Sequence, residues 1–361
     1  MRQKKIWPRA VIALVAGAVL LSGCTSSADS GGGSASPSGS SATAGLPEVA
    51  SPQQVIDLTL ASLKGKTVRG LYLTDAAALT QSWIKRSELA FAEVGVKYDY
   101  QVSNYDAAVQ AQQFQTAIDQ KVNAIIVHNP DVSALASLIT KAQQAGIYVI
   151  VMNLASNAQS DAFIGPNWDG MAYKLGLRVS DDCLARGKKE VAIISGFGSD
   201  SGSVLFVQGS ERAFKEKGMT VVATQPGQYD PSKAAAVAQT ILQQHPDLCA
   251  FTGNWDGMML GVSKVVSDQG KSGQVGVYTT DSSVGACQAI GAGTLTAAVS
   301  YNAGTGMGDA ASSLILYLMQ SGRPAGSSRT AIFMPTVLID KKNYEVPGIC
   351  YDTPYDWKKQ S

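Results

Sequence analysis

Short apolar runs alternate with helix-like patterns along most of the chain. Between the runs, apolar residues such as Leu79, Trp83 and Leu89 recur near helical spacing. Apolar strands that are separated by helices indicate a parallel sheet covered on both faces, and short linkers imply right-handed crossovers. The first part of the chain predicts strands over Val68–Leu73, Tyr98–Val102, Ala124–Val127 and Tyr148–Met152, with helices over Ala76–Val94, Ala107–Gln120 and Ser133–Ala145.

The same alternation begins again near residue 169. Its apolar runs predict strands over Val191–Ile194, Thr220–Thr224, Cys249–Thr252, Val275–Thr279 and Leu295–Ser300, followed by a last extended run over Ile332–Ile339. The helical patterns cover Asp169–Ala185, Gly202–Lys217, Ser232–Gln244, Gly257–Asp268, Val284–Ile290 and Thr305–Met319. We therefore expect two α/β lobes of similar construction.

The two halves also share a local unit. In the first half Tyr105-Asp106 precedes a helix and a strand that ends at Asn129-Pro130-Asp131, and in the second half Tyr229-Asp230 precedes a helix and a strand that ends at Asn254-Trp255-Asp256. Ligands of open parallel sheets bind at the carboxyl ends of the strands. Two repeated lobes of this kind predict a cleft with a ligand between them.

The N-terminal residues indicate that the protein is exported from the cytoplasm. The apolar run Val11–Leu21 is too short to span a bilayer, and Ser22-Gly23-Cys24 follows it. Residues 1–23 resemble a bacterial lipoprotein signal peptide, with Cys24 as the lipidated first residue; an uncleaved anchor helix is the alternative. Residues 24–50 are mostly Ser, Gly, Ala and Thr and predict a flexible, lipid-anchored linker. The basic residues that precede the apolar run are Arg2, Lys4, Lys5 and Arg9.

Composition excludes several classes of partner. The formal net charge is +1, charged residues make up 16% of the chain, and no long basic run follows the signal segment, so nucleic acid is not an indicated partner. A metal site is not expected, because no CxxC occurs and the two histidines, His128 and His245, are far apart in the sequence.

The cysteine count fits an exported protein. Once Cys24 is set aside, an even number of cysteines remains, which suggests disulfides and leaves three pairings open; buried free thiols are the alternative. These candidates are Cys183, Cys249, Cys287 and Cys350.

Several segments together resemble a known family. The best local matches are Ala124–Pro130, Ala145–Ile150, Asn254–Gly261 and Val277–Asp281, and the resemblance extends over nearly all of Lys66–Asp340. The chain resembles the type I periplasmic sugar-binding proteins of ribose- and galactose-binding type, which serve ABC transporters. The resemblance implies two doubly wound parallel-sheet lobes joined by a three-segment hinge near residues 167, 301 and 336. The first lobe would comprise residues 66–167 and 302–336, and the second residues 168–301 and 337–361.

A sugar site needs polar side chains and aromatic faces where strand ends meet the cleft. The alternative for an Asn or Asp after a strand is a helix cap. The candidates at strand ends are Thr74, Asp75, Asn153, Asn254, Trp255, Asp256 and Asp281, and those near the crossovers are Asn167, Trp168, Tyr301 and Asn302. Trp83, Tyr105 and Tyr229 are expected to be structural. His128, after a strand of the first lobe, is expected to be a hydrogen-bonded loop residue, with a ligand contact as the alternative.

The resemblance adds weight to Asn153, Asn254 and Asp281, which match ligand-contacting positions of ribose-binding proteins. The chain departs from that pattern at Leu154 and at Gln208, where those proteins carry arginines, and Tyr301 stands where they often have Gln. Loss of two guanidinium groups removes rigid donors for pairs of hydroxyls and argues against ribose itself.

Enzyme function finds little support. The segment Gly196–Ser201 follows a strand and opens a helix, as a dinucleotide motif would, but it lacks the third glycine, and Gln225 stands where an acidic residue is needed. No GxSxG segment occurs. We therefore expect neither catalysis nor a cofactor.

The sequence thus predicts a monomeric, lipid-anchored solute-binding protein on the outer face of the cell membrane. It would capture a small neutral polyhydroxyl ligand by hinge closure and deliver it to an ABC permease. The alternatives are a receptor that presents its ligand to a membrane sensor kinase, and binding of a nucleoside or a furanosyl signalling molecule.

Overall fold

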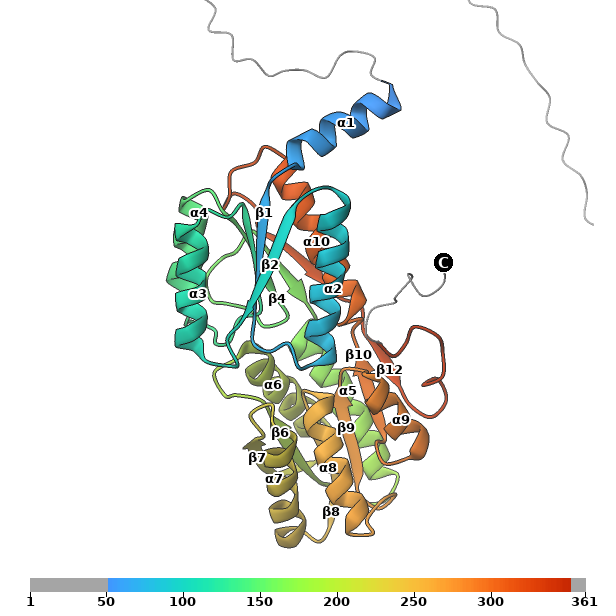
Figure 1. The fold of residues 1–361 in the computed structure, drawn as a ribbon. Helices are drawn as coiled ribbons and strands as arrows, with labels where there is room; N and C mark the ends of the chain where they lie inside the picture. The colour runs from blue at the N-terminus through green and yellow to red at the C-terminus, as the bar shows by residue number, and fades with distance from the viewer. Residues whose placement is uncertain (1–50, 352–361) are drawn as a thin grey trace, which may run out of the picture. The chain divides into compact units, whose positions relative to one another are not determined.

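The computed structural model describes residues 51–351, which form two six-stranded sheets with helices on both faces (Figure 1). The first sheet has the order β11-β5-β4-β3-β1-β2, and all of its strand pairs are parallel. Helices α2 (Ala78–Glu93) and α10 (Thr305–Gln320) pack on one face, and α3 (Ala107–Asp119) and α4 (Ala136–Gln144) cover the other. Its strands are β1 (Thr67–Tyr72), β2 (Lys97–Val102), β3 (Ala124–Val127), β4 (Tyr148–Met152), β5 (Ala162–Gly165) and β11 (Thr330–Phe333). This sheet and its helices are called the first lobe.

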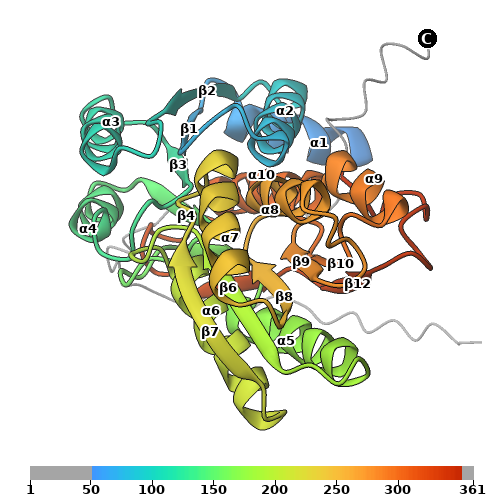
Figure 2. The same ribbon diagram turned by 90° about the horizontal axis from the view of Figure 1, so that it is seen from below.

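The second lobe repeats this construction with the order β12-β10-β9-β8-β6-β7 (Figure 2). Its strands are β6 (Glu190–Ser195), β7 (Thr220–Pro226), β8 (Leu248–Gly253), β9 (Gly276–Thr280), β10 (Ala297–Ser300) and β12 (Val337–Ile339). Its helices are α5 (Trp168–Leu184) and α6 (Ser201–Glu216) on one face, and α7 (Pro231–Gln244), α8 (Asp256–Asp268) and α9 (Val284–Ala292) on the other. Only β12 departs from parallel pairing, because it runs antiparallel to β10.

Burial explains why the central strands carry almost continuous apolar sequence. Every residue of β3, β8 and β9 is buried, as expected where helices cover both faces of a parallel sheet. The repeated Tyr-Asp unit begins a helix in each lobe. Asp106 accepts hydrogen bonds from the first-turn amides of α3, and Asp230 does the same for α7.

The chain passes between the sheets at three places: after β5, after β10 and after β11. These places match the expected crossovers, and the predicted fold class is confirmed. The extended run over Ile332–Ile339, however, is not one strand. It is divided between β11 in the first sheet and β12 in the second, with Pro335 between them.

Two elements were not predicted. Strand β5 has only four residues, too few to show a period. Helix α1 (Pro52–Leu63) precedes the first lobe, and its only buried residue is Leu63. A capping box between Ser51 and Gln54, with Pro52 in the first turn, accounts for its start.

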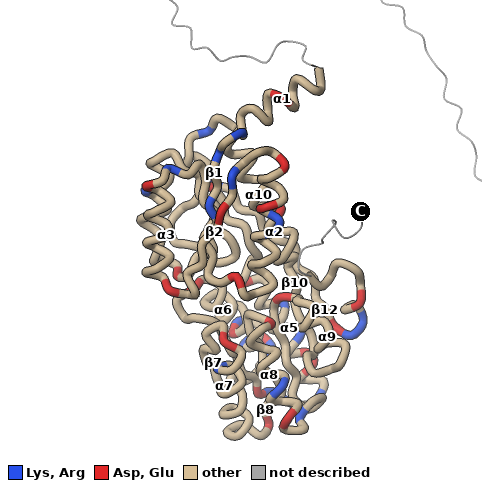
Figure 3. The backbone as a smooth tube through the Cα atoms, viewed as in Figure 1, with Lys and Arg blue, Asp and Glu red and all other residues tan. Residues whose placement is uncertain are grey.

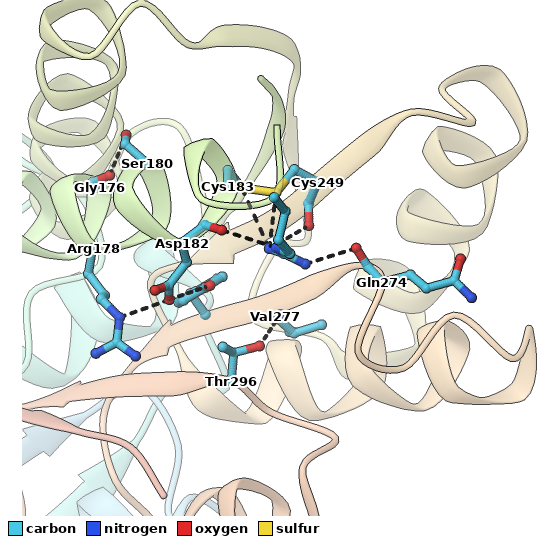
Figure 4. The surroundings of a disulfide bond; sticks show 11 residues. Gly176, Arg178, Ser180, Asp182, Cys183, Cys249, Gln274, Val277 and Thr296 are labelled. Carbon is cyan, nitrogen blue, oxygen red and sulfur yellow. Dashed lines mark hydrogen bonds and ion pairs between the residues drawn. A yellow bond between two sulfur atoms is a disulfide. The ribbon is translucent and has the colours of Figure 1, made fainter. Parts of the chain in front are cut away.

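All four remaining cysteines are paired, and both disulfides lie within the second lobe. Cys183 of α5 is bonded to Cys249 of β8, with Cα atoms 5.8 Å apart (Figure 4). Cys287 of α9 is bonded to Cys350, with Cα atoms 6.4 Å apart. The structure thereby selects one of the three pairings that the sequence left open.

Within residues 51–351, no helix has the length and apolar character needed to cross a bilayer. The same residues contain no group of three His, Cys, Asp or Glu side chains that could hold a metal ion. Basic and acidic residues are scattered along both lobes in the view of Figure 3. The predicted signal peptide, the lipidated Cys24 and the linker up to residue 50 lie outside the described residues.

Candidate functional site

A cavity lies between the two lobes, at the carboxyl ends of their central strands. The space between its atoms, including its opening, amounts to about 450 Å³. The first lobe contributes Leu73, Thr74, Ala77, Leu79, Thr80, Tyr105, His128, Asn153 and Leu154; the start of α5 and the second lobe contribute Trp168, Tyr229, Asn254, Trp255 and Asp281. This is the position at which open parallel sheets bind ligands.

The wall that the second lobe forms is held by a hydrogen-bond network. The Asn254 side chain accepts from the Gly196 amide (2.9 Å) and donates to Ser203 Oγ (3.1 Å) and to the Tyr229 hydroxyl (3.2 Å). Tyr229 in turn donates to Asp200 (3.1 Å), which caps α6. Burial raises the pKa of Asp200 to about 6. The hydrogen bonds of the Asn254 amide are therefore made within the protein, and its role is to position Tyr229.

Asp281 follows β9 and brings a carboxylate to the same wall. Its backbone has φ 72°, and its amide donates to the Val299 carbonyl (3.0 Å). The side chain is 2% exposed, and Oδ1 has no hydrogen-bond partner among the described residues. Burial, and then the nearby Asp256 carboxylate, raise the pKa of Asp281 well above its ordinary value. An unpaired acceptor in such a place is suited to a hydroxyl or amine donor.

Asp256 lies behind this wall and does not line the cavity. Its carboxylate accepts a hydrogen bond from the Ser283 amide (2.8 Å), and it is 2% exposed. Burial raises its pKa. Of the two roles that the sequence left open, the structure favours a local partner of the protein backbone over a direct ligand contact.

The first-lobe wall is mostly apolar. Leu73, Leu79 and Leu154 are all buried. Trp168 Nε1 donates to the Asn153 carbonyl (2.8 Å), and Asn153 Oδ1 accepts from the Tyr301 hydroxyl (3.2 Å). These bonds fix the Trp168 ring at the cavity with its single donor already used.

His128 is the exception on this wall. Its backbone is hydrogen-bonded to Leu71 and Gln110, but neither ring nitrogen has a partner among the described residues. The residue is 7% exposed, and the edge of Trp83 packs against its ring at 5.1 Å between centroids. Burial lowers its pKa to about 3, so the ring is neutral and offers one donor and one acceptor. The expected hydrogen bonds are therefore made by the His128 backbone alone, and the position of the side chain at the cavity fits the alternative of a ligand contact.

Aromatic residues join the lobes at the rim. Tyr105 of the first lobe stacks on Tyr229 of the second, with centroids 6.0 Å apart and planes 18° apart, and also contacts Phe197 at 5.8 Å. Beside them the Val132 amide donates to the Ser199 carbonyl across the gap (3.1 Å). The lobes are therefore in contact. Both tyrosines make the structural contacts expected of them, and both also line the cavity.

The structure brings together six of the eleven predicted site residues: Thr74, Asn153, Trp168, Asn254, Trp255 and Asp281. The other five do not line the cavity. Asp75 and Asn302 are exposed, and Asn167 is exposed and caps α5 by accepting from the Gly170 amide. Asp256 and Tyr301 are buried behind the walls. A position at a strand end is therefore not sufficient to place a side chain in the cavity wall. The turn that follows the strand can instead direct the side chain to solvent or into the core.

The apolar members of the wall were missed because they resemble ordinary core residues. Leu73 and Leu79 continue a buried strand and a helix, and nothing in the sequence separates them from packing residues. A signal did exist for two others: Tyr105 and Tyr229 hold the same place in the repeated unit. Gln208, compared above with a family arginine, is exposed on α6.

Residues 74–324 match the family described as periplasmic binding protein domain. This chain belongs to that family. The expectation of a binding fold rather than an enzyme fold is confirmed by this match. The chain is 31% identical over 181 residues to the D-ribose/D-allose-binding protein of Pseudomonas aeruginosa, covering 49% of this chain and 57% of that protein.

Two further comparisons agree. The chain is 29% identical over 209 residues to the D-allose-binding periplasmic protein of Escherichia coli, covering 55% of this chain and 67% of that protein. The chain thus spans between half and two thirds of the length of these curated relatives. The crystal structure of GanP, a glucose-galactose binding protein from Geobacillus stearothermophilus, has the same fold, with a TM-score of 0.71 and 22% identity over 79% of this chain and 99% of that one.

Proposed function

We propose that this protein captures a small neutral polyhydroxyl ligand, a sugar or a polyol, in the cavity between its lobes. The observation that carries the proposal is Asp281, a buried carboxylate with an unpaired oxygen in a cavity that Trp168 and Trp255 also line. A carboxylate oxygen accepts hydrogen bonds from hydroxyls, and indole faces pack against the C–H face of a sugar ring. The relatives named for ribose and allose support this ligand class.

The charges around the cavity favour a neutral ligand. No Lys or Arg is among the residues that line it, and the carboxyl groups of Asp281 and the nearby Asp256 offer an anion no positive charge. An anionic ligand would lose its water and meet carboxylates, a cost that hydrogen bonds alone do not offset. A ligand that carries an amine is compatible with the same charges.

The mechanism we propose is closure of the two lobes around the ligand. The three crossovers would act as the hinge, and the contacts of Tyr105 with Phe197 and Tyr229 would form only when the lobes meet. A ligand that touches both walls binds the closed form more tightly and shifts the equilibrium toward it. The closed form, as a monomer, would then deliver the ligand to an ABC permease.

Export and anchoring complete the proposal. The protein would be held on the outer face of the cell membrane by a lipid on Cys24, with residues 24–50 as a flexible linker. Two disulfides in the second lobe fit an oxidising compartment. Cell fractionation of a Cys24→Ala variant tests this part: the variant should leave the membrane fraction or accumulate as an uncleaved precursor. A variant that fractionates and migrates like the wild type would contradict the anchor.

Calorimetry of the full-length protein tests the ligand class. The panel comprises neutral sugars, polyols, nucleosides, sugar acids and sugar phosphates. We expect a neutral sugar or polyol to bind, and Asp281→Asn to weaken its binding by about 1–3 kcal/mol. Asp75→Asn, the same change at an exposed aspartate, serves as the control and should bind like the wild type. Tight binding of a sugar acid or phosphate, with all neutral compounds silent, would overturn the proposal.

A further inference from the structure

Several polar atoms of the cavity are already hydrogen-bonded within the protein. The Asn254 amide, the Trp168 donor and Asn153 Oδ1 all have partners in the protein. Among the described residues that line the cavity, the buried polar atoms without a partner belong to His128 and Asp281.

The first-lobe wall is apolar over a continuous part of the cavity. Leu73 and Leu79 lie at the end of β1 and the start of α2, and Leu154 follows β4; they are 1%, 6% and 2% exposed. Leu154 also reaches the second lobe, since a Cβ on Gly202 would lie 2.7 Å from its Cδ2 atom. The leucine is therefore held in place between the lobes and is not free to turn away from the ligand.

A hydroxyl that faced these leucines would lose its water without gaining a hydrogen bond, whereas a methyl or methylene group there would be removed from water favourably. Asp281, on the opposite wall, needs a donor. The first-lobe wall thus favours an apolar group on one side of the ligand, and the second-lobe wall favours a hydrogen-bond donor on the other side.

From this arrangement we propose that the ligand is a deoxy sugar, or a polyol that likewise lacks one hydroxyl. Its hydroxyls contact Asp281 and His128, and its deoxy carbon or methyl group lies against Leu73, Leu79 and Leu154. The inference rests on the proposed function of sugar or polyol capture and narrows its ligand class.

Calorimetry with matched pairs of sugars that differ by one hydroxyl tests the inference on the full-length protein. The pairs are D-fucose and D-galactose, L-rhamnose and L-mannose, and 2-deoxy-D-ribose and D-ribose. In the pair that fits the site, we expect the deoxy sugar to bind about 10- to 100-fold tighter, which is the discrimination that an apolar pocket achieves against an added hydroxyl.

Leu154→Gln adds a donor and an acceptor at the apolar wall. We expect it to reduce or reverse the preference for the deoxy sugar by about tenfold. Leu58→Gln, the same change at a leucine that is 49% exposed on α1, should leave the preference unchanged. Leu79→Gln repeats the test at a second wall position if Leu154→Gln melts at a much lower temperature than the wild type.

The outcomes separate this inference from the function on which it rests. Equal or tighter binding of the hydroxylated sugar in every pair overturns the deoxy-ligand inference and leaves sugar capture intact. Silence of all sugars and polyols overturns both. A preference for the deoxy sugar that Leu154→Gln does not change assigns the selectivity elsewhere and overturns the role of the leucine wall.

Discussion

Asn254 and Leu154 face the same cavity from opposite lobes and are held in different ways. The Asn254 amide makes three hydrogen bonds, which connect it to β6, α6 and Tyr229. The Leu154 side chain is held by packing, with its Cδ2 atom beside the Gly202 backbone. The second lobe also contains both disulfides, and the first lobe contains none among the described residues.

This difference indicates a division of roles between the lobes. A wall that is already fixed by hydrogen bonds loses little side-chain freedom when the ligand binds. An apolar wall gains most from removing water, which happens only when the lobes close. We therefore expect the second lobe to orient the ligand through its polar groups and the first lobe to stabilise the closed state by apolar contact.

The largest effect should come from the covalent part of the second lobe. The double substitution Cys183→Ala with Cys249→Ala removes one disulfide. The two cysteines are 66 positions apart in the sequence, so the variant no longer constrains a loop of that length in the unfolded chain. The free energy of unfolding should fall by about 4 kcal/mol, since the unfolded chain gains that loop's entropy. Urea denaturation measures the change, and thiol counting verifies that the Cys287–Cys350 bond remains. A loss below about 1 kcal/mol would mean that the Cys183–Cys249 bond adds little to the noncovalent contacts and the remaining disulfide of this lobe.

The next effect tests the hydrogen-bonded wall. Asn254→Ala removes three hydrogen bonds and leaves the buried Gly196 amide without its acceptor. We expect the free energy of unfolding to fall by about 2–3 kcal/mol. Asn157→Ala, at an exposed asparagine, is the control and should change it by less than about 0.5 kcal/mol. Equal effects from the two variants would remove the distinction between a wall held by hydrogen bonds and one held by packing.

A pH titration sharpens the view of His128 on the first-lobe wall. Its pKa is about 3 in the folded protein because of burial, and about 6.5 is usual for an unfolded chain. The unfolded chain therefore takes up a proton in this window that the folded protein does not. Stability from the neutral ring is complete above pH 6.5 and decreases as the pH falls toward 3, by about 1.4 kcal/mol per pH unit.

His128→Phe removes that dependence and can still pack against Trp83. Relative to wild type, the variant should gain about 2 kcal/mol of unfolding free energy between pH 7.5 and pH 5. Carboxyl groups whose pKa is raised, such as Asp200, increase the free energy of unfolding as the pH falls. They are present in both proteins, so their effect cancels in the comparison. Parallel stability curves, from thermal or urea unfolding at each pH, would show that His128 is accessible to protons in the folded state.

The smallest effect concerns the rim. Tyr105→Ala removes the stack with Tyr229 and the contact with Phe197, and should weaken ligand binding by about 0.5–1.5 kcal/mol through the closed state. Tyr317→Ala, at a tyrosine that is 53% exposed on α10, is the matched control. Calorimetry gives the affinities, and fluorescence energy transfer between labels on the two lobes reports closure. Unchanged affinity and closure would limit Tyr105 to a role in the first lobe alone.

Much of the fold follows from local patterns in the sequence. Strands such as Ala124–Val127 are predicted to the residue, because a buried parallel strand is uniformly apolar and is bounded by helices. The exceptions are segments whose partners are distant in the chain. Residues 332–339 look like one extended run, but β11 pairs with β5 and β12 pairs with β10, so that tertiary contacts determine the break.

The site was predicted less completely, for a related reason. Strand-end position suggests Asn153 and Asp281, which line the cavity, but it also selects Asp75, which the next turn leaves exposed. The apolar wall gives no sequence signal, since Leu73 has the same surroundings in sequence as any core leucine. For His128, only the structure shows that both ring nitrogens lack partners.

The way the chain returns to each sheet has a consequence for synthesis. Strands β11 and β12 are edge strands of different sheets, and both lie within Thr330–Ile339. During synthesis from the N-terminus, β5 and β10 therefore keep unpaired edges until residues 330–339 have been made. An open strand edge is a site for incorrect pairing. A nascent chain that stops before residue 330 lacks an edge strand of each sheet. Residues 330–339 supply both edge strands, so β5 and β10 gain their partners at nearly the same time.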